Sequence, residues 1–81
     1  MLDETIQISM LYDFYGPLLT KRQQQLVDLY FNENLSLTEI SSQVGISKQA
    51  ISVGLKTAEK SLMEYEKKLG LVKRWETERV G

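Results

Sequence analysis

A group of cationic and amide side chains follows a glycine turn and offers the clearest chemistry in the chain. The turn is Val44-Gly45-Ile46-Ser47, and lysine and glutamine come directly after it. Lysine binds phosphates or guanine edges, and glutamine can form two hydrogen bonds with adenine. Two further cations begin an earlier segment and are expected to reach backbone phosphates. The candidate nucleic-acid contacts are Lys48, Gln49, Ser52, Lys56, Lys60, Lys21 and Arg22.

The composition gives little support to catalysis or to metal binding. The 81 residues include no cysteine and no histidine, which removes disulfides, thiolate metal sites and the commonest general base. The serines have no histidine or evident lysine base beside them, and no phosphate-binding or calcium-binding loop motif occurs. We therefore expect a protein that is not an enzyme and that has no cofactor and no metal site.

Charge and hydropathy indicate where in the cell the protein is located. The net charge is −1, but residues 1–19 carry three acidic side chains and no base, whereas residues 47–60 carry three lysines and one glutamate. No apolar run approaches the roughly 20 residues needed to cross a bilayer. The first apolar stretch follows acidic residues, which is unlike a signal peptide. We expect a cytoplasmic protein without membrane insertion.

Capping signals divide the chain into four predicted helices. Thr20 and Ser36 each begin a capping box, Ser47 is a further N-cap, and Gly45 and Gly70 suit the ends of helices. The break Gly16-Pro17 ends a first helix whose N-cap is predicted at Asp3. The predicted helices span about 3–15, 21–33, 37–44 and 48–69, and the tail 71–81 is either a short helix or frayed.

A short helix, a glycine turn and a second helix are typical of a helix-turn-helix. The apolar residues on both sides of the turn should face inward, and Ser41 should be small because the two helices approach each other there. We predict an all-α fold of one domain, residues 1–81, with a trihelical core at about 20–62, an N-terminal helix and a long C-terminal helix. The alternative is a plain helical pair whose lysines only face solvent.

Two family resemblances rest on these motifs. The core resembles region 4 of sigma-70 factors through Leu19-Thr20-Lys21-Arg22-Gln23, Leu35-Ser36-Leu37-Thr38-Glu39-Ile40 and Val44-Gly45-Ile46-Ser47. Nearly the whole chain resembles the YlxM family of small bacterial helix-turn-helix proteins. That match rests on Phe14-Tyr15-Gly16-Pro17-Leu18-Leu19-Thr20, Ile46-Ser47-Lys48-Gln49-Ala50, Ala58-Glu59-Lys60 and Glu64-Tyr65-Glu66-Lys67-Lys68-Leu69.

The second resemblance implies a cellular context. Genes of the YlxM family lie beside those of the signal recognition particle GTPase and its receptor, which implies a role in that pathway. We therefore expect a nucleic-acid-binding regulatory protein whose ligand is DNA or the particle's RNA. The alternatives are an accessory factor that binds the particle's GTPase or its receptor, and a helical oligomer that does not bind DNA.

The chain departs from the family in the middle of the recognition helix. Residues 52–57 read Ser-Val-Gly-Leu-Lys-Thr, where the family usually has an aromatic and several polar residues, and Lys48 stands where arginine is common. Gly54 inside a helix costs about 1 kcal/mol relative to alanine. These departures weaken the case for base-specific reading of DNA without affecting the fold.

Apolar residues beyond the needs of a trihelical core predict a homodimer. The first predicted helix is apolar on several sides, and the long helix continues its apolar seam to its end. The candidate interface residues are Leu2, Ile6, Met10, Phe14, Leu62, Tyr65 and Leu69. The alternative is intramolecular, with the first helix folded back along the second half of the long helix and the tail covering the rest.

Overall fold

One long helix carries all the others. The structure, a computed structural model, describes residues 4–80, and the side chains of residues 6–78. Its elements are α1 (Glu4–Tyr15), the 3₁₀ turn η1 (Gly16–Leu18), α2 (Lys21–Val27), the π-helical turn η2 (Asp28–Asn32), α3 (Leu37–Val44), α4 (Lys48–Leu69) and α5 (Leu71–Val80). No strand occurs among the described residues, so the predicted all-α fold is confirmed.

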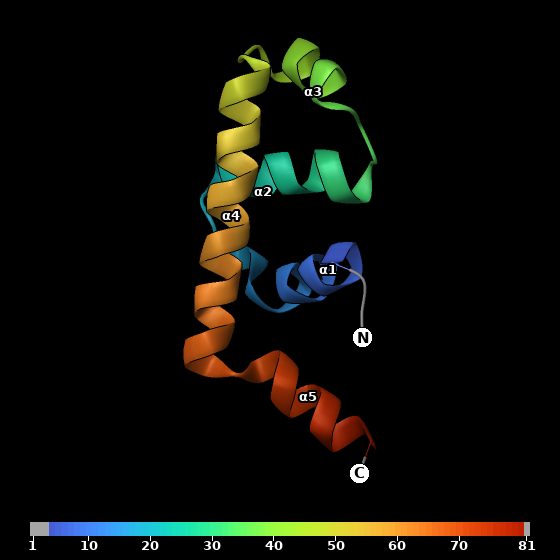
Figure 1. The fold of residues 1–81 in the computed structure, drawn as a ribbon, viewed down its shortest axis with the longest axis vertical. Helices are drawn as coiled ribbons and strands as arrows, with labels where there is room; N and C mark the ends of the chain where they lie inside the picture. The colour runs from blue at the N-terminus through green and yellow to red at the C-terminus, as the bar shows by residue number, and fades with distance from the viewer. Residues whose placement is uncertain (1–3, 81) are drawn as a thin grey trace.

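The arrangement is a ladder rather than a bundle. Figure 1 shows α4 as an upright, with α3, α2, α1 and α5 following one another along the same side of it. The molecule measures 45 × 20 × 17 Å. We call α2, η2, α3 and residues 48–58 of α4 the helix-turn-helix half, and α1, residues 59–69 of α4 and α5 the distal half. The opposite side of α4 carries no helix (Figure 1).

The helix ends follow the local signals of the sequence. Thr20 and Ser36 form complete capping boxes with the side chains three residues later, and the Ser47 hydroxyl accepts a hydrogen bond from the backbone N–H of Ala50. Gly45 and Gly70 have φ of 82° and 61°, a left-handed conformation in which only glycine avoids a steric penalty. These predicted boundaries are confirmed, whereas the predicted cap Asp3 lies outside the described residues.

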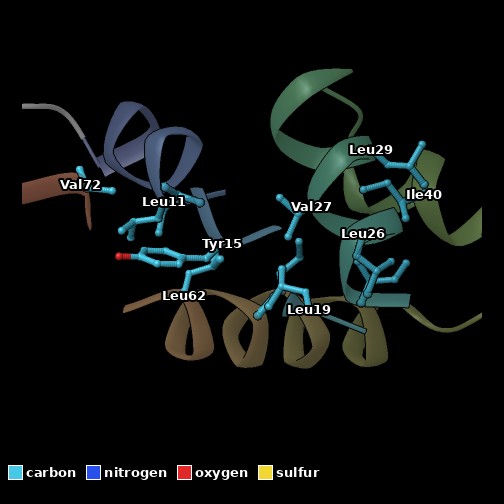
Figure 2. Packing of buried hydrophobic residues seen from close by; sticks show 13 residues of the cluster. Leu11, Tyr15, Leu19, Leu26, Val27, Leu29, Ile40, Leu62 and Val72 are labelled. Carbon is cyan, nitrogen blue, oxygen red and sulfur yellow. The ribbon is translucent and has the colours of Figure 1, made fainter. Parts of the chain in front are cut away.

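One continuous core runs the length of α4. Figure 2 shows Val72, Leu11 and Tyr15 near Leu62 at one end of the cluster, and Leu26, Leu29 and Ile40 at the other. Leu19 and Val27 lie between the two groups and join them (Figure 2). Both halves therefore share a single apolar interior.

Two predicted elements differ from the structure. The predicted helix 21–33 leaves the α-helical hydrogen-bonding pattern after Val27, and its last residues form the π turn η2. There the backbone N–H of Glu33 bonds to the carbonyl of Asp28, at 2.9 Å, five residues back rather than four. The tail is helical as α5, which resolves the two alternatives for residues 71–80.

A polar contact among α1, α4 and α5 sets the position of α5. The Tyr15 hydroxyl donates to Glu66 Oε1 at 2.5 Å, and the same carboxylate accepts the backbone N–H groups of Val72 and Lys73, both at 3.0 Å. The Tyr15 oxygen also accepts the N–H of Leu71 at 3.0 Å. Glu66 thus satisfies free N–H groups at the start of α5, which an N-cap would otherwise do.

The two side chains in this contact influence each other's ionisation. Burial and the hydrogen bond to Glu66 raise the pKa of the Tyr15 hydroxyl. Burial also acts to raise the pKa of Glu66, but the hydrogen bonds from Tyr15 and from the α5 backbone outweigh it, so that the pKa of this carboxyl is lowered. Glu66 is therefore charged and Tyr15 protonated at neutral pH.

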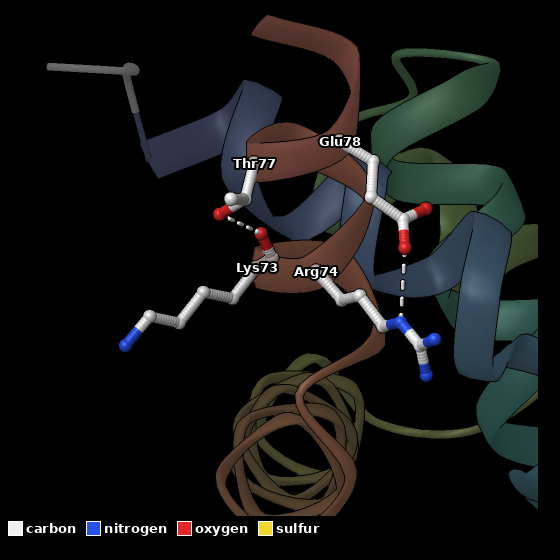
Figure 3. A network of polar contacts seen from close by, with 4 residues as sticks. All are labelled: Lys73, Arg74, Thr77 and Glu78. Carbon is white, nitrogen blue, oxygen red and sulfur yellow. Dashed lines mark hydrogen bonds and ion pairs between the residues drawn. The ribbon is translucent and has the colours of Figure 1, made fainter. Parts of the chain in front are cut away.

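Side chains on α5 interact with other residues of the same helix. Figure 3 shows the Arg74 guanidinium paired with Glu78 at 3.1 Å, and the Thr77 hydroxyl donating to the carbonyl of Lys73 at 2.9 Å. Arg74 and Glu78 are exposed, so the pair contributes little to stability.

The distal half covers much of the apolar surface that the sequence assigned to a dimer. Leu62 is fully buried within the chain, so its predicted place in an interface between chains is wrong. Ile8, Leu11 and Tyr15 form the inner face of α1, and Met10 and Tyr65 pack beside them, half-buried. The predicted stripe of Ile6, Met10 and Phe14 lies at the side of this inner face, where Ile6 and Phe14 are exposed and Met10 is half-buried. Leu2 lies outside the described residues.

Candidate nucleic-acid interface

The turn between α3 and α4 is fixed by packing and by one partly buried hydrogen bond. Ile40 and Ile51 are fully buried on either side of it. The Ser41 hydroxyl donates to the carbonyl of Ile46 at 2.6 Å, which explains why a small polar residue stands at this helix approach. The two helices are thereby held as a helix-turn-helix, with α4 as its second helix.

A glycine in α4 lets α2 approach closely. A Cβ added to Gly54 would lie 2.7 Å from Leu26 Cδ1, which is too close for two carbon atoms that are not bonded to each other. Leu26 is almost completely buried. The sequence indicated only the cost of Gly54 to the helix, and the structure supplies the compensating contact with α2.

Four of the predicted contacts are exposed side chains of α4. Lys48, Gln49, Lys56 and Lys60 are exposed, as is Val53 between them with 64% of its surface accessible. The helical spacing places Gln49, Val53, Lys56 and Lys60 away from the buried seam of Ile51, Leu55, Ala58 and Leu62, whereas Lys48 lies nearer the seam and is exposed at the first position of the helix. The first turns of α4 thus present cations, an amide and an apolar side chain to solvent.

Ser52, the fifth predicted contact on α4, is placed differently. It is half-buried and lines a hollow of about 170 Å³ between α4, α3 and η2. The hollow is lined by Tyr30, Leu37, Ser52, Leu55, Lys56 and Glu59. Ser52 and Lys56 therefore meet in one place, together with an aromatic ring that sequence reasoning missed.

A second hollow lies along the outer side of α4. It measures about 300 Å³ and is lined by Lys56, Glu59, Lys60, Met63, Glu64 and Lys67. Lys56 and Glu59 border both hollows. The exposed Lys67 extends the lysine row beyond the predicted contacts. Its spacing of 7 residues from Lys60, which itself follows Lys56 by 4, would have been the signal for it.

Lys21 and Arg22 are exposed in the first turn of α2 and lie apart from the first turn of α4. Leu18, just before α2, accepts a hydrogen bond from Tyr65, whereas Leu26 reaches Gly54. The start of α2 therefore lies beside the middle of α4 (Figure 1). Residues 48 and 58 are about 15 Å apart along an α-helix, so the two cation groups would contact separate parts of a ligand.

Metal chemistry and membrane insertion find no site in the described part of the chain. No group of three or more acidic, histidine or cysteine side chains comes together there to hold a metal ion. None of the described helices is both long and apolar enough to span a membrane. The exposed side chains of α4 are cationic, amide and apolar. Together, the fold and this surface define a helix-turn-helix protein.

Comparison with known proteins gives the family. A profile described as "Putative helix-turn-helix protein, YlxM / p13 like", of the family UPF0122, matches residues 2–80. The chain is 47% identical over 77 residues to a UPF0122 protein of Desulforamulus reducens, 48% over 66 to one of Symbiobacterium thermophilum, and 40% over 79 to one of Shouchella clausii. The chain belongs to the UPF0122 family of YlxM-like proteins, as its motifs predicted.

These relatives are longer than the chain. The alignments cover 95%, 82% and 98% of this chain, and 66%, 62% and 72% of the respective relatives. The chain thus spans about two thirds of the length of the curated relatives it matches.

Proposed function

We propose that the protein is a nucleic-acid-binding regulator rather than an enzyme. The observation that carries this proposal is the exposure of Lys48, Gln49, Lys56 and Lys60 on the second helix of a helix-turn-helix. That helix is the one such motifs place against base edges. Lys21 and Arg22, displaced along α4, would contact the phosphate backbone.

The cellular role we propose rests on family resemblance. Genes of YlxM proteins lie beside those of the signal recognition particle GTPase and its receptor, and we infer that this protein regulates that pathway in the cytoplasm. DNA and the particle's RNA are both candidate ligands. The same protein surface would suit either ligand, because DNA and RNA both carry phosphates and base edges.

Salt dependence tests the proposal. Each phosphate neutralised on duplex DNA contributes about −0.9 to the slope of log K against log salt. If Lys21, Arg22, Lys48, Lys56 and Lys60 all engage, we expect a slope of about −4 to −5 per monomer. Lys48→Glu with Lys56→Glu should abolish binding while circular dichroism stays unchanged. Lys73→Glu on α5 is the matched control and should leave binding intact. Binding that survives the double substitution contradicts the assignment.

A second proposal concerns the distal half, which we infer joins two copies of the chain. Phe14 and Trp75 pack edge to face with ring centroids 6.2 Å apart, yet 36% and 40% of their surfaces stay accessible. Leu69 and Leu71, at the junction of α4 and α5, are also exposed. These side chains and Ile6 would form a homodimer interface in place of the predicted set that includes Leu62. The same surface would serve the alternative function, binding to the targeting GTPases.

Sedimentation equilibrium tests the dimer. We expect a species of twice 9.3 kDa at tens of micromolar, which Phe14→Glu converts to monomer. Val53→Glu, an exposed apolar site in the other half, is the control and should not affect the mass. A monomeric wild-type chain at that concentration contradicts the dimer.

A further inference from the structure

We propose that the hollow between η2, α3 and α4 is a binding site for one unpaired nucleobase. This inference rests on the proposed function and specifies which feature of a nucleic acid the protein prefers. The hollow combines an aromatic ring, an apolar floor, a hydroxyl, a carboxylate and an ammonium group. These are the groups that hold a base by stacking and by hydrogen bonds to its edge.

The π turn presents the ring. Tyr30 lies within η2, with 39% of its surface accessible, and packs edge to face on Phe31 with centroids 5.0 Å apart. Phe31 is half-buried against the core, so it supports Tyr30 from below. An exposed aromatic side chain with a fixed neighbour offers a stacking surface at little cost in side-chain entropy.

Both ends of the turn are held by hydrogen bonds. At its start, the Asp28 carboxylate accepts from Asn32 Nδ2 at 2.8 Å and from the Tyr12 hydroxyl of α1 at 3.2 Å. At its end, the backbone N–H of Leu35 bonds to the carbonyl of Leu29 at 2.9 Å. Single π turns are uncommon in α-helices and frequently occur at functional sites.

The polar groups of the hollow suit the edge and the phosphate of a nucleotide. The Ser52 hydroxyl can donate or accept, the Glu59 carboxylate can accept from an exocyclic amine, and the Lys56 ammonium can bind the adjoining phosphate. Leu37 and Leu55 supply apolar contact to the ring. The volume, about 170 Å³, is large enough for one base.

Three lysines, interspersed with Glu59 and Glu64, line the approach to the hollow. Lys56 also borders the outer hollow of α4, where Lys60 and Lys67 continue the row. Lys56 and Lys60 are separated by about 6 Å along the helix. A charged track beside an aromatic platform is the arrangement with which proteins bind single strands. A strand that follows the lysines would bring its base to Tyr30.

Binding to matched oligonucleotides tests the inference. We would measure fluorescence anisotropy with a fully paired duplex and with the same duplex carrying one bulged adenosine, each made as DNA and as RNA. The bulged forms should bind about 10-fold more tightly than the paired ones. A ribose or deoxyribose preference between the two bulged probes identifies the source of the base.

Substitutions at Tyr30 separate stacking from folding. Tyr30→Ala should abolish the preference for the bulge and leave duplex affinity unchanged, whereas Tyr30→Phe should retain the preference. Tyr30→Leu keeps an apolar side chain if the alanine variant is unfolded, and it should also abolish the preference. A 2-aminopurine placed at the bulge should be quenched by the wild type and by Tyr30→Phe only.

The failures are distinguishable. If paired and bulged duplexes bind equally, or if Tyr30→Leu keeps the preference in a folded protein, the inference is overturned and the proposed function stands. If no probe of either sugar binds, the proposed function fails and the inference fails with it.

Discussion

The two halves of the molecule are shaped by polar contacts of different range. In the helix-turn-helix half, Thr20, Ser36 and Ser47 bond to backbone groups three residues later, and Ser41 reaches five residues along. In the distal half, the Tyr15 hydroxyl bonds to groups 51 and 56 residues away. The first half is specified by local sequence, and the second by contacts that exist only once the chain has folded.

This difference separates the roles of the two halves. Local caps and a glycine turn form the frame of the first half, from which α4 exposes the surface that we propose binds nucleic acid. The long-range contacts of Tyr15 and Glu66 instead close the end of the core and position the exposed pair Phe14 and Trp75. Predictions that perturb one half at a time test how far the two depend on each other.

The largest effects should come from core truncation, and they should be equal in both halves. Ile51→Ala in the helix-turn-helix half and Leu62→Ala in the distal half each remove a fully buried side chain from α4. We expect each to lower the free energy of unfolding by about 2–5 kcal/mol. Urea titration followed by circular dichroism measures the loss.

The same titration shows whether the halves unfold together. Trp75 is the only tryptophan and lies on α5, so its fluorescence reports on the distal half alone. Because one core runs along α4, we expect the fluorescence and dichroism transitions to coincide in both variants. Separate transitions would mean that the halves are independent units.

A smaller effect is expected from breaking the contact that positions α5. Glu66→Gln should destabilise the chain by about 1.5–3 kcal/mol, because charge-assisted hydrogen bonds from Tyr15 and from the backbone of Val72 and Lys73 are weakened. Glu64→Gln, an exposed change nearby on α4, should have almost no effect. Equal losses in the two variants would deny Glu66 this role.

The stability difference between the wild type and Glu66→Gln should depend on pH in a definite direction. The pKa of Glu66 is lowered by folding, so its stabilisation is complete above the unfolded value of about 4.3 and is lost as the pH falls through the folded pKa. The wild type should therefore exceed Glu66→Gln in stability by a constant amount above about pH 5. The gap should narrow at lower pH, and a gap that widens there would contradict the assignment.

Removal of a local cap should have a still smaller effect. Ser36→Ala takes the capping hydroxyl from the backbone N–H of Glu39 at the start of α3. The expected loss is about 1 kcal/mol. Ser36→Thr keeps the hydroxyl and should restore most of the stability, and an equal loss in both variants would show that the cap does not stabilise α3.

Charge substitutions should leave stability nearly unchanged and yet distinguish the halves by function. Lys21→Gln with Arg22→Gln should lower the magnitude of the salt slope by up to about 2, because two phosphate contacts are removed. Lys73→Gln on α5 should not change the slope. If only Lys73→Gln changed the salt slope, the binding surface would lie in the distal half instead.

Most of the helix-turn-helix half could be predicted from the sequence because its signals are local. The two capping boxes, Ser47 and Gly45 define helix ends without reference to the rest of the chain. The π turn was missed because residues 28–32 carry no local pattern that distinguishes it from an α-helix. Tyr30 was overlooked for the same reason, since its place beside Ser52 depends on that turn.

The distal half was harder to predict because its contacts join distant residues. The inner face of α1 is formed by Ile8, Leu11 and Tyr15, but the helix is apolar on several sides, so hydropathy alone does not select it. Nothing in the local sequence distinguishes Glu66 from the other glutamates of α4, Glu59 and Glu64. Its role depends on where α5 starts, which periodicity does not reveal, and this is why Leu62 was assigned to a partner chain rather than to α1.

The order in which the helices are synthesised has a consequence, because α4 follows α1, α2 and α3 in the chain. Residues 1–47, which include α1, α2 and α3, leave the ribosome before α4 begins. At about 5–20 residues per second, synthesis of the 22 residues of α4 takes roughly a further 1–4 s. Ile8, Leu26 and Ile40, all buried in the finished protein, lack the α4 part of their core during that time. The three earlier helices therefore complete their shared core only after α4 has been made.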